Sequence, residues 1–338
     1  MKNWKKAGLT ALAGSLVATS AFAGAMTVSG TANITYTANT GAQDNGGDQP
    51  DLTFLGTDGS RWGINKTLSF SGSGELDNGW TVSVSQSLAA ATTTGIGLTL
   101  DMGDMGTLNF EADTGGRGIS GIKDMMPTAD EDVGNGIDVD GSGTVGGLSG
   151  TVSGGTKGFN YTKTLDMVEI GLGYAPKGAA GSAQGGVSGD GGNTSATSGY
   201  VKIDPMDGLE IGGGWGETAN AAAVEQTNDH STYYASYVWG SLTIAAQQSE
   251  IDYYNSANDD ESTAYGILYA VNDEMSISYQ DRTNDRGGTT IDEEISGWSA
   301  SYTMGSMTFK AHSNEGTGMD NTANKTSEHT EVGVTFAF

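Results

Sequence analysis

Residues 26–38, MTVSGTANITYTA, alternate in character at every step along the chain. The even positions from Met26 to Ala38 are apolar, aromatic or small, and every odd position from Thr27 to Thr37 is polar. Successive side chains of a β-strand point to opposite faces, so this period of two predicts a strand with one apolar and one polar face. The pattern alone leaves open whether the apolar face meets a protein core or lipid.

The same alternation recurs along the whole chain and predicts an all-β protein of sixteen strands. The segments are 26–38, 62–76, 80–88, 95–102, 106–112, 158–164, 167–174, 197–204, 208–215, 231–240, 241–250, 261–271, 274–282, 293–303, 306–313 and 327–338. Between the second and third, Asp77-Asn78-Gly79 is a tight hairpin sequence that permits positive φ.

The connections between these segments alternate between long and short. Long polar loops at 39–60, 113–157 and 175–196 are interleaved with short links such as 77–79 and 165–166. This order places every short turn at one end of the strands and every longer loop at the other. Greek-key sandwiches do not sort their connections in this way. A closed antiparallel up-and-down barrel does, and transmembrane barrels combine short turns with long external loops.

The size of such a barrel predicts which face meets water. Sixteen strands enclose a lumen too wide to be filled by side chains, so we expect the polar face to line water and the apolar face to meet lipid. Aromatic residues of the apolar parity lie near strand ends, where membrane-interface girdles belong. They are Trp62, Trp80, Tyr174, Trp215, Tyr233, Trp239, Trp298, Tyr302 and Phe338.

The N-terminal residues 1–23 have the features of a secretory signal peptide. Lys2, Lys5 and Lys6 precede an apolar stretch, and Ala21-Phe22-Ala23 is an A-x-A cleavage sequence. A short amphipathic anchor helix is the alternative. We expect cleavage after Ala23 and a single exported domain over 24–338.

Charge and cysteine content exclude several classes of protein. The chain of 338 residues has no cysteine, which rules out disulfides and Cys-based zinc sites. Its net charge is −26, and losing the three lysines of the signal peptide would take it from −26 to −29. This charge argues against nucleic acid as a partner.

Several segments resemble Gram-negative general diffusion porins: the signal peptide, 68–86 (LSFSGSGELDNGWTVSVSQ), 97–113 (GLTLDMGDMGTLNFEAD) and 332–338 (VGVTFAF). The resemblance implies a sixteen-stranded outer-membrane barrel, usually a homotrimer, that passes small hydrophilic solutes and ions. It also implies a third long loop folded into the lumen, with acidic side chains facing basic ones on the wall. The terminal Phe338 matches the family's outer-membrane assembly signal. The third loop departs from enteric members, because it reads KDMMPTADED (123–132) instead of P-E-F-G-G-D.

Charged residues at the polar parity and in the third loop are the candidate pore residues. The wall cations are Arg61, Lys202, Arg282 and Lys310, and the loop candidates are Asp113, Arg117, Asp124, Asp130, Glu131 and Asp132. If the loop folds inward, its carboxylates would face the wall cations, and such opposed charges favour one ion sign. The negative net charge favours cations. A solvated acidic loop is the alternative reading of 130–132.

Cofactors and catalysis are not expected. Residues 138–143 (DVDGSG) and 185–193 (GGVSGDGGN) resemble calcium-binding loops only weakly, which leaves a loop-bound calcium as a minor alternative. No nucleophile-elbow, zinc-protease, Walker A or dinucleotide motif accompanies the three histidines. The leading hypothesis is a passive channel. The alternatives are an exported surface structural or adhesive β-protein and a substrate-specific outer-membrane channel.

Overall fold

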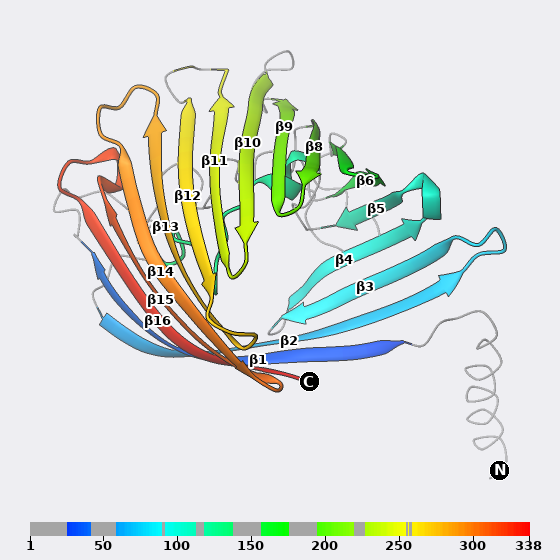
Figure 1. The fold of residues 1–338 in the computed structure, drawn as a ribbon, viewed down its shortest axis with the longest axis horizontal. Coiled ribbons are helices and arrows are strands. Elements are labelled where there is room, and N and C mark those ends of the chain that lie inside the picture. Colours follow the sequence, from blue (N-terminus) through cyan, green and yellow to red (C-terminus); the bar gives the residue numbers. More distant parts are fainter. Residues whose placement is uncertain are drawn as a thin grey trace, which may run out of the picture.

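The fold is taken from a computed structural model (Figure 1), and residues 26–41, 59–89, 92–112, 118–137, 157–175, 195–219, 227–254, 256 and 259–338 are described. Several sequence predictions lie outside these residues. They are the signal peptide at 1–23, the loop residues Asp113 and Arg117, and the calcium-like segments 138–143 and 185–193.

Sixteen strands follow one another along the described chain, and each corresponds to one of the sixteen predicted segments. They are β1 (Thr27–Gly41), β2 (Gly59–Glu75), β3 (Thr81–Ala89), β4 (Thr92–Asp101), β5 (Thr107–Ala112), β6 (Lys157–Leu165), β7 (Val168–Ala175), β8 (Ala196–Met206), β9 (Leu209–Ala219), β10 (Thr227–Trp239), β11 (Leu242–Asp252), β12 (Asp260–Ala270), β13 (Met275–Arg286), β14 (Glu293–Met304), β15 (Met307–Thr317) and β16 (Thr326–Ala337).

The strands close into a barrel in simple chain order. Each strand pairs antiparallel with its sequence neighbours, and β1 also pairs with β16, so the wall in Figure 1 runs from β1 to β16 without a crossover. The predicted up-and-down barrel is confirmed. Because closure leaves no free sheet edge, every strand has a partner on both sides, which hydrocarbon requires.

Short turns join alternate strand pairs at one end of the barrel, here called the turn end. They link β2 to β3, β4 to β5, β6 to β7, β8 to β9, β10 to β11, β12 to β13 and β14 to β15. In the first of them, Asn78 Oδ1 accepts the Trp80 N–H at 3.2 Å. Gly79 has a φ of 83°, which side-chain-bearing residues rarely adopt. The predicted hairpin at 77–79 is therefore confirmed.

The apolar face points outward, opposite to the usual arrangement of a soluble protein. Trp62 and Ile64 are 75% and 79% exposed on the outside of β2. Inward polar residues, by contrast, are buried, including Ser249 of β11 and Ser299 of β14. This distribution confirms the predicted inversion, because only a non-aqueous surround lets so many large apolar side chains face out.

Outward aromatic residues lie toward both ends of the wall. Trp215 and Trp298 lie in the loop-side halves of β9 and β14, whereas Trp239 and Phe338 lie at the turn end. Ile267 of β12 is among the outward aliphatic residues. These positions are typical of interface girdles around an apolar band.

Helical structure in the described chain is limited to short 3₁₀ segments, which include η1 (Gly103–Met105), η2 (Gly118–Ile122) and η5 (Met319–Asn321). Within these residues, no helix has both the length and the apolar character needed to cross a membrane.

Candidate functional site in the lumen

Residues 118–137, called here the inward segment, lie against the inner wall of the barrel (drawn in teal in Figure 1). The Gly118 N–H donates to Asn160 Oδ1 of β6 at 3.0 Å. The Ile119 N–H donates to Ser198 Oγ of β8 at 3.2 Å. Because both acceptors belong to the inward parity of their strands, the segment begins inside the lumen.

The second half of the segment continues along the wall to β13, β14 and β15. The Ala129 N–H donates to Ser278 Oγ at 3.0 Å, and the Val133 N–H donates to Gln280 Oε1 at 3.2 Å. Asn314 Nδ2 of β15 donates to the Asn135 carbonyl oxygen at 2.9 Å. Wall side chains therefore satisfy the backbone of a segment that has no strand partner. The remainder of the predicted third loop lies outside the described residues, and its course stays a prediction.

Apolar side chains of the segment pack into wall positions that are themselves apolar. Ile119 packs on Ile251 of β11. Val133 and Ile137 pack on Ile295 of β14, and Met319 completes this second cluster. Met126 packs on Ala245 and Ala264. The sequence analysis did not identify these docking positions. Ile251 and Ile295 are apolar residues on the polar parity, and that mismatch is the signal that could have revealed them.

Asp130 is the centre of the charged contacts between segment and wall. Its carboxylate forms an ion pair with Lys310 of β15, and its Oδ2 lies 3.2 Å from His312 Nδ1. The Asp130 side chain is only 3% exposed. Burial alone would raise its pKa, but the hydrogen bond from His312 and the hydrogen bond and charge of Lys310 hold the pKa of Asp130 below its usual value. Asp130 is therefore ionised and anchors the segment to β15.

Asp132 and Asp124 both interact with one buried cation, Arg282 of β13. The Arg282 side chain is 1% exposed, and both carboxyl groups interact with its charge. Burial and a hydrogen bond with Asp124 raise the pKa of Asp132 to about 8. Because two close carboxyl groups resist joint ionisation, the Asp132 carboxyl holds its proton near neutral pH.

The other predicted pore residues lie apart from these contacts. Lys202 of β8 pairs with Glu169 of β7 at 3.0 Å. Arg61 is exposed on β2, and its charge acts on His329. Glu131 is exposed, and its carbonyl oxygen accepts the Thr128 hydroxyl at 2.8 Å. The structure thus brings Asp130 to Lys310, and Asp124 and Asp132 to Arg282. The sequence analysis expected the loop carboxylates to face the wall cations, and Asp130 and Lys310 are in direct contact.

A stacked histidine pair lies beside Asp130. The rings of His312 and His329 have centroids 5.2 Å apart and an interplanar angle of 27°. His329 Nδ1 lies 2.6 Å from Asn39 Oδ1 of β1. Both Nε2 atoms are buried without a hydrogen-bond partner among the described residues. Both histidines occupy the polar parity of their strands and are buried on the lumen side of the wall.

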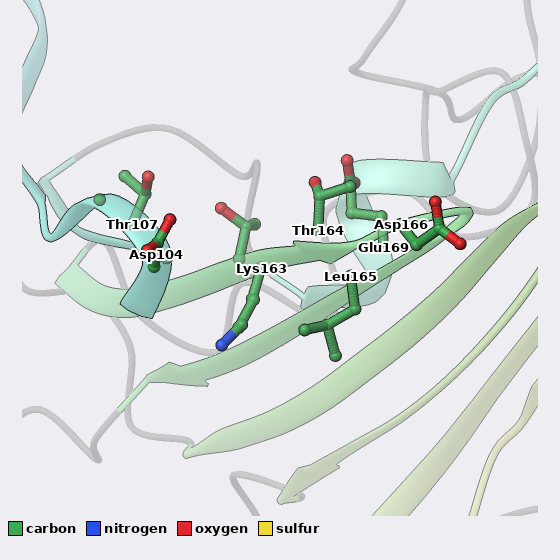
Figure 2. A pocket seen from close by; sticks show the side chains of 10 residues that line it. Asp104, Thr107, Lys163, Thr164, Leu165, Asp166 and Glu169 are labelled. Atoms are coloured by element: carbon green, nitrogen blue, oxygen red, sulfur yellow. The ribbon is translucent and has the colours of Figure 1, made fainter.

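Two hollows at the turn end carry carboxylates. The first, of about 520 Å³, lies between the β4–β5 and β6–β7 turns. Figure 2 shows Asp104 on one side of it and Asp166 and Glu169 on the other, with Lys163 between. The second, also of about 520 Å³, lies at the β8–β9 turn, and its lining includes Asp207.

No cluster of three or more potential metal ligands occurs among the residues that the structure describes. The two calcium-like segments of the sequence lie outside them, and a loop-bound calcium stays a prediction.

Comparison with known proteins identifies relatives of this architecture. The family model for Gram-negative porins matches residues 8–338. A porin structure refined at 1.8 Å is similar with a TM-score of 0.64 and 14% identity, over 93% of this chain and 100% of that one. An anion-selective porin from Comamonas acidovorans has a TM-score of 0.60 and 15% identity, over 93% and 99%. The outer-membrane expressed OmpT of Vibrio cholerae has a TM-score of 0.63 and 14% identity, over 93% and 97%. Among curated proteins, no sequence relative matches the chain.

Proposed function

The chain belongs to the Gram-negative porin family, whose members form outer-membrane channels for passive diffusion, and we propose that this channel prefers cations and passes small hydrophilic solutes. Transport through it needs no energy coupling, no cofactor and no catalytic step. The preferred ion sign is a property of this chain's own lumen, since an anion-selective porin has the same fold at 15% identity.

The observation that carries the cation preference is the unequal distribution of charge along the passage. The wall cations Lys310 and Arg282 are neutralised by carboxylates of the inward segment. At the turn end, carboxylates exceed cations in both hollows. They are Asp104, Asp166, Glu169, Asp204, Asp207 and Glu210. A mouth with an excess of one sign of charge concentrates counter-ions.

The reversal potential in a KCl gradient across a planar bilayer tests this preference. We expect a potential of the sign set by K⁺ permeation. The double variant Asp104→Asn and Asp207→Asn removes two exposed mouth carboxylates and should shift the potential toward zero. Asp77→Asn, in the turn before Gly79, is the control for a charge removed from outside the hollows. Clear anion selectivity of the wild-type protein would exclude the proposal.

Assembly and export follow the family resemblance. We propose that residues 1–23 are removed after Ala23, that Phe338 serves as the assembly signal, and that three copies form a homotrimer. The exposed apolar outer wall supports an environment of lipid or a second subunit. Mass spectrometry of the purified protein tests the cleavage site, and chemical cross-linking in detergent tests the trimer.

A substrate-specific channel is the remaining functional alternative. A dedicated solute site would show saturation and competition, whereas a general pore discriminates by size and charge alone. Liposome swelling with sugars of graded size separates the two, because a general pore gives rates that fall smoothly with solute size.

A further inference from the structure

Two neighbouring strand pairs contain the same three-residue motif, Glu-Ile-Gly. The first copy occupies 169–171 of β7. Gly171 stands opposite Tyr200 of β8 in the strand register. The Tyr200 hydroxyl reaches diagonally and donates to Glu169 Oε1 at 2.8 Å. The tyrosine ring therefore lies flat on the inner wall, over the glycine.

The second copy occupies 210–212 of β9, and its geometry is the same. Gly212 stands opposite Tyr234 of β10, and the Tyr234 hydroxyl donates to Glu210 Oε1 at 2.6 Å. A Cβ at Gly212 would lie 2.2 Å from Cε1 of Tyr234, and one at Gly171 would lie 2.1 Å from Cε1 of Tyr200. Only glycine permits either ring to occupy its place.

Ile122 of the inward segment packs on both rings. It is fully buried in one cluster with Tyr200 and Tyr234, and Met125 packs against the cluster. The backbone around Ile122 is held as well. Gln247 Nε2 of β11 donates to the Ile122 carbonyl oxygen at 2.8 Å, and Gln247 Oε1 accepts the Met125 N–H at 2.8 Å.

We propose that the two Glu-Ile-Gly/Tyr units, called here the twin cradle, seat Ile122 and thereby set the width of the passage, with Tyr200 and Tyr234 as positioning residues. Water in an open lumen competes with the segment's hydrogen bonds, and salt screens its ion pairs. The apolar contact of Ile122 with the two rings depends on neither hydrogen bonds nor ion pairs, so neither water nor salt competes with it in this way. The effect on passage width rests on the proposed channel function.

The first test compares two adjacent glycines of β9. In Gly212→Ala, the new methyl displaces the Tyr234 ring toward the lumen and pushes the segment inward. Single-channel conductance should fall, and the largest sugar that enters liposomes should become smaller. Gly213→Ala is the matched control, because the atom nearest to a Cβ added there, the Thr232 carbonyl oxygen, is 3.6 Å away. Equal conductance of both variants, with heat-modifiable gel mobility showing folded barrels, would overturn the proposal.

Ile122→Ala provides a second test of the proposal, which applies even if Gly212→Ala does not fold. This variant alters no wall residue and removes the side chain that the cradle holds. The segment should then move, and open-channel current noise should rise above that of the wild type. Ser120→Ala, in the same segment but outside the cradle, is its control. Wild-type noise and conductance in Ile122→Ala would overturn the proposal.

A cross-link separates failure of the cradle from failure of the proposed function. The chain has no cysteine, and a Cβ at Gly214 would lie 2.8 Å from Cγ1 of Ile119, beside the cradle. The double variant Ile119→Cys and Gly214→Cys should form a disulfide in the folded barrel. A variant that cross-links but does not conduct would support the docking of the segment and refute the proposed channel function. A variant that conducts but does not cross-link would refute the cradle and support the channel function.

Discussion

Gly30 of β1 and Phe338, the C-terminal residue, exchange two backbone hydrogen bonds where the first and last strands meet. The Gly30 N–H donates to the Phe338 carbonyl oxygen at 2.8 Å, and the Phe338 N–H donates to the Gly30 carbonyl oxygen at 3.0 Å. A Cβ at Gly30 would lie 2.7 Å from Cε2 of the Phe338 ring. The terminal aromatic ring therefore covers a glycine at the closure of the barrel.

Substitution of Gly30 should impair closure of the barrel. In Gly30→Leu, the side chain occupies the position of the Phe338 ring, so less of the protein should reach the heat-modifiable folded form in detergent. Gly72→Ala in β2 is the control, because a Cβ there has no neighbour within 4 Å. A folded yield of Gly30→Leu equal to that of Gly72→Ala would show that the contact is dispensable.

Adjacent residues of β1 should respond very differently to a charge. Ile34 faces outward and is 44% exposed. A lysine on the lipid face costs about 2–4 kcal/mol near the midplane of the bilayer. Ile34→Lys should therefore lower the yield of folded protein in lipid vesicles, whereas Thr35→Lys places its charge in the lumen. Similar damage from the two variants would count against the inverted arrangement of faces.

The contribution of Asp132 to the stability of the barrel should increase as the pH falls from about 8 toward 4. Its pKa is raised from 3.8 to about 8 in the folded protein. Between these values the folded state holds a proton that the unfolded chain has released, so stability decreases as pH rises and levels off above pH 8. Asp132→Asn should remove this slope. Urea midpoints of the detergent-folded protein across pH provide the measurement, and parallel curves for the two proteins would contradict it.

Asp130 should have the opposite pH dependence. Because its pKa is lowered in the folded state, its ionised carboxylate stabilises the fold above its ordinary value of 3.8, and this contribution is lost as pH falls through the lower folded value. Asp130→Asn should therefore lower the urea midpoint at pH 7, and the difference from wild type should shrink below about pH 4. Glu131→Gln removes the same charge at an exposed position and is the control.

The sequence predicted the barrel well because one physical rule applies to every strand. A wall with water inside and lipid outside requires period-two alternation along its whole length, so all sixteen segments were visible. Strand limits were less accurate toward the loops. β10 begins at Thr227, four residues before the predicted start at 231, because the strand extends beyond the apolar band, where outward residues are polar.

The path of the inward segment was less predictable, since its contacts join residues far apart in sequence. The charge pattern suggested that loop acids would meet wall cations, and Asp130 does meet Lys310. Charge alone did not indicate that Lys202 would pair with Glu169 of the neighbouring strand instead. The docking of Ile122 also depends on two tyrosines whose orientation follows from the glycines opposite them. No single-residue propensity encodes such a combination.

Single-channel recording of the folded wild-type protein in a planar bilayer tests the central claim most directly. A water-filled barrel narrowed by a docked inward segment should insert in discrete conductance steps, each carrying a steady current. A protein that shows heat-modifiable folding, inserts into the bilayer and never conducts would contradict the account.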